Sequence, residues 1–236
     1  LAVAMFAALM VLGWTMPKIL HVSEDEAGTY KLMTIFNNIG YMGFPVIAAT
    51  YGNEALLYAA IFTLPFNMLI YTYGIHIVNQ KSSKKADFQW RNILNAGVVS
   101  GIAAIILYLG NVPVPQFFKG TVSGFGALTA PLSMMAIGIS LAGIRLRELF
   151  ADVKLLVYTA VKLLVIPVAG TLLVVRILDN DLLCHVCMIM LATPVASMVV
   201  MLAQQYDSNF ELAAKGVALT TMLSVITIPI VSAIVF

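Results

Sequence analysis

One stretch of this chain combines residues that could hold an anion with residues that interrupt a helix. It reads NNIGYMGFPVIAATYG, from Asn37 to Gly52, and contains two Asn, three Gly and one Pro in an otherwise apolar region. Gly and Pro weaken helices, and an amide needs hydrogen-bond partners, so this composition is costly in a helix that faces lipid. A helix that restarts after a break offers N–H groups and the positive end of its dipole, which favour an anion. The stretch therefore predicts an anion site at a broken membrane helix.

A second stretch near the other end of the chain has the same character. It reads LATPVASMVVMLAQQY, and Pro194 interrupts it much as Pro45 interrupts the first stretch. Paired spans interrupted by Gly or Pro, one in each half of a sequence, indicate the midplane binding site of a secondary transporter. We therefore expect the backbones broken at Pro45 and Pro194 to form one binding site, with Gly40 and Gly43 allowing their close approach.

The polar side chains of these stretches are the candidate ligands. Asn37 or Asn38 can offer an amide to a carboxylate or to the unwound backbone itself. Asn37 is equally suited to capping the break. Thr193 and Ser197 flank the second Pro, and their hydroxyls can coordinate a substrate or bond back to their own helix.

Lys162 is a charged residue expected near the middle of a span, where a charge is costly and indicates a function by default. Two alternatives are open: it extends toward the cytoplasm or pairs structurally, or it holds an anion or gates the site. Glu54, Asp207 and Glu211 lie at span ends, so we expect no carboxylate-based ion site inside this chain. No catalytic, metal or cofactor residue is predicted, and the predicted substrate-binding residues are Asn37, Asn38, Gly40, Gly43, Pro45, Thr193, Pro194, Ser197 and Lys162.

Composition places these segments in an all-α membrane protein. Of the 236 residues, 61% are hydrophobic and 10% are charged, with a mean hydropathy of +0.97, whereas a soluble domain carries about 25% charged residues. The net charge of +2 is too small to indicate a nucleic-acid partner. A spanning helix needs about 20 apolar residues. The eight predicted spans are residues 1–20, 32–51, 55–78, 93–112, 121–142, 153–175, 182–204 and 212–236.

Basic residues favour one side of the predicted membrane. Of the 13 Lys and Arg residues, ten fall in one set of loops and only Lys119 and Arg176 in the other, so the first set is predicted to be cytoplasmic. Residues 79–92 then form a cytoplasmic linker between residues 1–78 and residues 93–236. An odd number of crossings separates the two interrupted spans, which predicts an inverted repeat. Because the first half lacks partners for spans 93–112 and 121–142, we expect an intact protein of ten spans whose first two are missing here.

At these segments the chain resembles the auxin efflux carrier family in its bacterial branch, which is related to the plant PIN exporters and more distantly to bile-acid/sodium symporters. FNNIGYMGFPVIAATYG resembles the family's N-x-G-x-x-G-x-P segment, APLSMMAIGISLA its P-L-x-M-x-x-I-G-x-S-L-A segment, and VKLLVIP its K-L-x-x-x-P segment. ATPVASMVVMLAQQY and LTTMLSVITIPI are similar to its closing spans. The resemblance implies two inverted five-helix repeats, with the fourth and ninth helices broken at Pro and crossing. It also implies that Asn38 occupies the position whose Asn contacts the substrate carboxylate in the plant exporters.

The predicted function is a secondary transporter, or permease, that moves small organic anions such as carboxylates across the bacterial inner membrane by alternating access. Its predicted partners are the anion and the lipid bilayer. The sequence leaves open the substrate, the direction of transport, a coupling ion (proton or sodium) and a homodimeric assembly. The alternatives are a ligand-sensing membrane module and an intramembrane enzyme. The chain has no H-E-x-x-H motif and no paired intramembrane aspartates, which argues against the enzyme.

Overall fold

The structure is a computed structural model, and it describes residues 1–79, 96–110, 112–128, 131–132, 135, 139, 149–206 and 208–236. These residues form helices and the connections between them, with one isolated β-bridge and no strand among them. Residues 80–92 of the predicted linker and most of residues 129–142 lie outside the described part. The predicted all-α membrane fold is confirmed.

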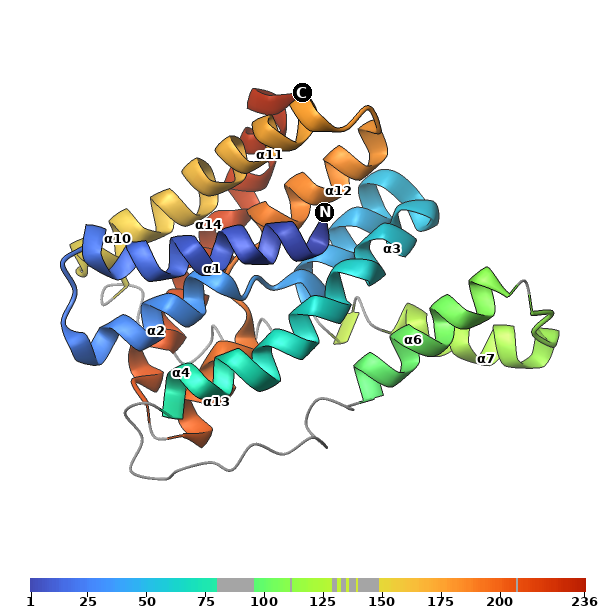
Figure 1. The fold of residues 1–236 in the computed structure, drawn as a ribbon, viewed down its shortest axis with the longest axis horizontal. Coiled ribbons are helices and arrows are strands. Elements are labelled where there is room, and N and C mark those ends of the chain that lie inside the picture. The colour runs from blue at the N-terminus through green and yellow to red at the C-terminus, as the bar shows by residue number, and fades with distance from the viewer. Residues whose placement is uncertain are drawn as a thin grey trace.

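The first part of the chain forms two helices, a break and a long bent helical run (Figure 1). α2 returns alongside α1, and the chain then crosses the interior before it re-enters a helix. The bend lies at Gly52, whose φ of 75° and ψ of −175° are accessible to glycine and strained for other residues. The elements are α1 (Ala2–Ile19), α2 (Glu24–Ile35), the π-helix η1 (Ile39–Gly43), α3 (Phe44–Leu69), the π-helix η2 (Ile70–Gly74) and α4 (Ile75–Asn79).

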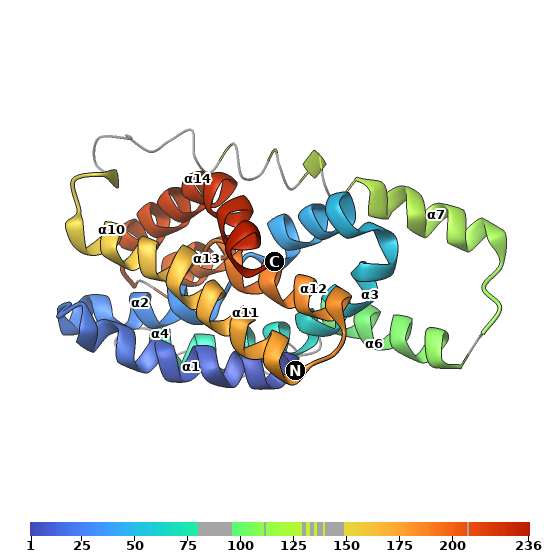
Figure 2. The same ribbon diagram turned by 90° about the horizontal axis from the view of Figure 1, so that it is seen from above.

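The last part of the chain contains a long helical run, two short helices around a break, and a long final helix. The final helix packs against both short helices and against α2 of the first part. The elements of this last part are α10 (Val153–Ala160), the π-helix η3 (Val161–Val165), α11 (Ile166–Ile177), α12 (Asp181–Ala192), α13 (Ser197–Gln205) and α14 (Phe210–Val235). Between the two parts, α6 (Ala96–Leu109) and α7 (Gln116–Ala127) project to one side in both views (Figures 1 and 2).

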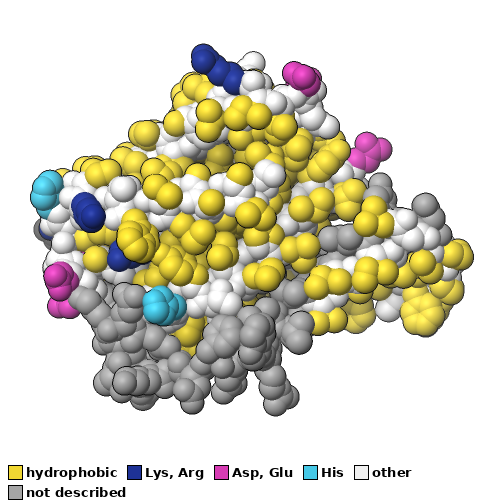
Figure 3. All heavy atoms as spheres, viewed as in Figure 1, with side chains coloured by type: hydrophobic (Ala, Val, Ile, Leu, Met, Phe, Trp, Pro, Cys, Tyr) yellow, Lys and Arg dark blue, Asp and Glu magenta, His cyan; other side chains and the backbone are white. Residues whose placement is uncertain are grey.

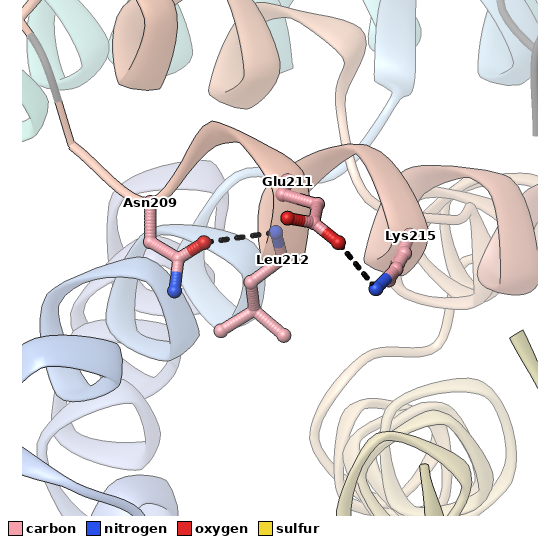
Figure 4. A network of polar contacts seen from close by, with 4 residues as sticks. All are labelled: Asn209, Glu211, Leu212 and Lys215. Carbon is pink, nitrogen blue, oxygen red and sulfur yellow. Dashed lines mark hydrogen bonds and ion pairs between the residues drawn. The ribbon is translucent and has the colours of Figure 1, made fainter. Parts of the chain in front are cut away.

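Short polar side chains define the starts of these helices. At the start of α14, the Asn209 side-chain oxygen accepts the Leu212 N–H at 3.0 Å, which satisfies one of the N–H groups that have no partner inside the helix (Figure 4). Glu211 and Lys215 form an ion pair of 2.6 Å one turn apart. Asn180 caps α12 in the same way, through the Leu183 N–H. The polar residues at these helix starts therefore lie at the ends of the apolar segments.

By length and composition, four helical runs among the described residues could cross a membrane: Ala2–Ile19, Ile39–Val78, Val153–Ile177 and Phe210–Val235. Hydrophobic side chains cover most of the described surface in Figure 3, as expected for helices that face lipid. The predicted spans 32–51 and 182–204 are not single helices, because a break interrupts each of them. The inverted repeat and the two missing spans stay predictions.

Candidate functional site

The two breaks cross in the interior of the protein. The first covers residues 36–38, between α2 and η1, and the second covers residues 193–196, between α12 and α13. Asn37 and Val195 form an antiparallel bridge there, and the side chains of both residues are fully buried. The interrupted stretches therefore meet backbone to backbone. The hydrogen bonds that flank the bridge are Asn38 N–H to the Pro194 carbonyl (2.7 Å) and Ala196 N–H to the Phe36 carbonyl (2.9 Å).

The two prolines occupy different places relative to the breaks. Pro194 lies within the second break, as expected. Pro45 does not break its helix: it lies in the first turn of α3, directly after η1, so the expected break at Pro45 is wrong. Proline cannot donate to an earlier carbonyl, and the π-helical turn η1 directly before α3 lets Pro45 stay helical. The chain instead leaves the helix at residues 36–38, where the backbone hydrogen-bonds to the second stretch.

Lys162 and Asn37 connect the ends of two helices at the crossing. Lys162, in η3, is fully buried, and its Nζ donates to the Thr34 carbonyl at 2.8 Å and to the Asn37 Oδ1. The Asn37 Nδ2 donates to the carbonyls of Met190 (2.8 Å) and Leu191 (3.3 Å). Thr34 lies in the last turn of α2, and the other two carbonyls lie in the last turn of α12. Lys162 is therefore paired inside the protein and does not extend toward the membrane surface.

Asn38 is arranged differently from its neighbour. Its Oδ1 accepts the Tyr41 N–H at 3.2 Å and so caps η1. Its Nδ2 is buried and has no hydrogen-bond partner among the residues that the structure describes. A buried amide N–H group without a partner is costly, which makes this atom a candidate donor to a ligand.

Thr193 and Ser197, the other two polar residues predicted in the second stretch, have different roles: Thr193 bonds to its own helix and Ser197 lines a cavity. The Thr193 hydroxyl donates to the Met190 carbonyl at 3.0 Å, so of the two alternatives it bonds back to its helix. Ser197 begins α13, is half-buried and lines a cavity of about 330 Å³. The lining is mostly apolar and comes from η1, α13 and α14: Tyr41, Ser197, Val200, Met201, Ala214, Val217 and Ala218.

The expectation that Gly40 and Gly43 allow a close approach of the crossing backbones is wrong. A Cβ atom at Gly43 would lie 3.6 Å from the Thr193 Cγ2 and from the Met190 Sδ, which is an ordinary contact distance. A Cβ atom at Gly40 would have no neighbour within 4 Å. The two backbones approach through the bridge at residues 37 and 195 instead.

Sequence reasoning missed Thr220, on α14, which supports the second break. Its Oγ1 accepts the Val195 N–H at 3.1 Å, and its own hydroxyl hydrogen is directed to carbonyls one turn earlier in α14. A Thr inside the apolar segment LTTMLSV is the only sequence signal for this role. Among the described residues, no three His, Cys, Asp or Glu side chains gather in a way that could hold a metal ion.

Comparison with known proteins places this architecture in a family. The family described as "Membrane transport protein" matches residues 1–89 and 85–232, which together cover nearly the whole chain. The chain belongs to this family. The resemblance to auxin efflux carriers is thereby confirmed.

Two curated relatives of this chain carry transporter names. An uncharacterized transporter of Methanothermobacter thermautotrophicus is 22% identical over 198 residues, which cover 84% of this chain and 64% of that protein. An uncharacterized transporter of Methanocaldococcus jannaschii is 25% identical over 221 residues, 89% of this chain and 69% of that protein. The chain thus spans about two thirds of the length of these relatives. A membrane transporter, rather than an enzyme, is the class that the family supports.

Proposed function

We propose that the protein is a secondary transporter that moves small organic anions such as carboxylates across the bacterial inner membrane by alternating access. The observation that carries this proposal is the buried, unpartnered Nδ2 of Asn38 beside the crossing of two broken helices. Irregular backbone at membrane depth is tolerated only where it is buried in protein or lines a cavity. A substrate site at the crossing would explain why the backbone is irregular at residues 36–38 and 193–196.

The donors and the cavity suit an anion with an apolar body. α13 begins at Ser197, so the positive end of its dipole lies at the cavity that Ser197 lines. Val200, Met201 and Val217 make most of the remaining wall apolar. We therefore propose that a carboxylate oxygen accepts from Asn38 and from the start of α13, while the carbon skeleton contacts the apolar wall.

The conformation of Asn38 also fits an alternating-access cycle. Its Nδ2 is occluded in the structure, so a substrate oxygen reaches it only after the crossing and its neighbours move apart. A carrier exposes its site to one side at a time, which requires an occluded state between the two. The coupling ion is left to experiment, by imposing a proton or a sodium gradient during uptake.

The test is uptake of radiolabelled benzoate and succinate by proteoliposomes that contain the intact carrier. Asn38→Ala should weaken the affinity for a transported anion about 10- to over 100-fold, because a lost hydrogen bond to a charged group is worth about 1.5–3 kcal/mol. Asn209→Ala is the matched control, since Asn209 also accepts one N–H at a helix start but caps α14, beyond the end of α13 that lies away from the crossing.

The outcomes separate the competing functions. Unchanged affinity in folded Asn38→Ala protein would rule out Asn38 as a ligand. Saturable binding without uptake under any imposed gradient would contradict transport and favour a ligand-sensing module. Chemical conversion of the added anion would favour an enzyme.

A further inference from the structure

The buried charge of Lys162 has only neutral partners among the contacts that the structure describes. Its Nζ donates to the Thr34 carbonyl and to the Asn37 Oδ1, and its side chain is fully buried. An ammonium group inside a protein is costly unless negative charge or dipoles compensate it. The compensation must therefore come from the groups that surround these two oxygens.

Those groups are the C-terminal ends of two helices. Thr34 lies in the last turn of α2, and Asn37 in turn donates to the Met190 and Leu191 carbonyls in the last turn of α12. Each helix C-terminus carries roughly half a negative elementary charge, so the two ends together carry roughly one. One ammonium group is thus matched to both ends, directly at α2 and through the Asn37 amide at α12.

This matching affects the other side of the crossing. The continuous helical run of η1 and α3 begins there, and so does α13, so the positive ends of their dipoles lie close to the negative ends of α2 and α12. Without a cation, the fields of the positive and the negative helix ends would largely cancel at a ligand in the cavity. With the negative ends neutralised, the positive ends dominate the local field.

We propose that Lys162 is a positioning residue that neutralises the C-terminal ends of α2 and α12, so that the crossing selects a negatively charged ligand. Lys162 does not touch the ligand in this proposal, and Asn37 extends the effect of its charge to α12. The proposal rests on the proposed transport of organic anions and explains how the site prefers an anion to a neutral molecule of the same shape.

A purely structural role for Lys162 makes a different prediction. In that case the hydrogen bonds to Thr34 and Asn37 matter and the charge does not, so charged and neutral ligands weaken together when the bonds are lost. Benzoate and benzamide separate the two roles, because they have nearly the same shape and differ in charge. The ratio of their affinities reports the field at the site and is insensitive to general loosening.

The experiment measures displacement of radiolabelled benzoate by unlabelled benzoate and by benzamide in the purified intact carrier. Lys162→Arg keeps the charge, and Lys162→Gln and Lys162→Met remove it, with folding checked by size-exclusion chromatography. The neutral variants should lower the benzoate-to-benzamide affinity ratio about 5- to 30-fold, and the Arg variant should change it less than about threefold. Lys154→Gln is the matched control, because exposed Lys154 also donates to a backbone carbonyl, that of His21, at 3.1 Å.

Each outcome decides the proposal. A wild-type affinity ratio in folded Lys162→Gln or Lys162→Met protein overturns it, also when the affinities for benzoate and benzamide fall by the same factor. If neither neutral variant folds, Lys162→Arg decides alone: a folded Arg variant that loses the preference for benzoate refutes a role of the charge. Failure of the wild-type carrier to bind any organic anion would instead refute the proposed function.

Discussion

The same substitution should affect stability at one of the two adjacent asparagines of the crossing and anion binding at the other. Asn37 is fully buried, and its side chain makes three hydrogen bonds, one from Lys162 and one each to Met190 and Leu191. The side chain of Asn38 accepts one N–H, from Tyr41, and its Nδ2 has no partner in the described part of the chain. Replacement by Leu keeps the approximate size of each side chain and removes the amide. We expect Asn37→Leu to reduce stability and Asn38→Leu to reduce anion binding.

The magnitudes follow from the partners that each substitution leaves behind. In Asn37→Leu, Lys162 loses a charged hydrogen bond, worth about 1.5–3 kcal/mol, and the Leu191 carbonyl becomes unsatisfied, at about 1–3 kcal/mol. The Met190 carbonyl keeps the Thr193 hydroxyl as a donor. The total loss of unfolding free energy is therefore about 2.5–6 kcal/mol. Asn38→Leu loses one helix cap, about 0.5–2 kcal/mol, and also removes a buried unpartnered donor, which offsets part of that loss.

The assay is equilibrium unfolding of the intact carrier in mixed micelles, followed by circular dichroism, together with benzoate binding on the folded fraction. Asn209→Leu, at the half-buried start of α14, gives the baseline for losing one helix cap. The reasoning would be refuted if Asn37→Leu were no less stable than Asn38→Leu. It would also be refuted if Asn38→Leu bound benzoate as tightly as the unmodified carrier.

Three further substitutions test the packing around the crossing and the bend in α3. Thr220→Val removes the acceptor of the Val195 N–H and should lower the free energy of unfolding in micelles by about 1–3 kcal/mol. Gly216→Ala would place a Cβ against the Met33 Sδ, closer than van der Waals contact, so a lower midpoint of thermal unfolding is expected from overpacking. Gly52→Ala would have no neighbour within 4 Å at its Cβ but would strain a φ of 75°, which should reduce the free energy of unfolding in micelles by about 1–3 kcal/mol.

The membrane class was predictable because it depends on local properties of the sequence, and the crossing was expected from the family resemblance of two interrupted stretches. Long apolar runs indicate spans, and the Gly, Pro and Asn residues of two stretches mark the places where helices stop. The location of the first break was not predictable from Pro45. It depends on hydrogen bonds between residues 36–38 and a second stretch more than 150 residues later, and the π-helical turn η1 lets Pro45 stay helical.

The roles of individual polar residues were less predictable than the site itself. Asn37 and Asn38 are neighbours of the same type, yet one joins two helix ends and the other keeps an unpartnered donor. The sequence left Lys162 with two alternatives, because its partners lie more than 120 residues away along the chain. Only the position of η3 against the crossing brings its Nζ to Thr34 and Asn37.

The chemistry of Asn37 suits the connection that it makes between Lys162 and α12. The ammonium group needs an acceptor, and the Met190 and Leu191 carbonyls need a donor, and a neutral amide provides both. A carboxylate at this position would accept from Lys162 but could not donate while ionised, and it would place two carbonyl oxygens against a negative charge. It would also cancel the charge of Lys162 before that charge could offset the ends of α2 and α12. An amide would therefore preserve the positive field that the proposed anion site needs at the crossing, whereas an acidic residue would remove it.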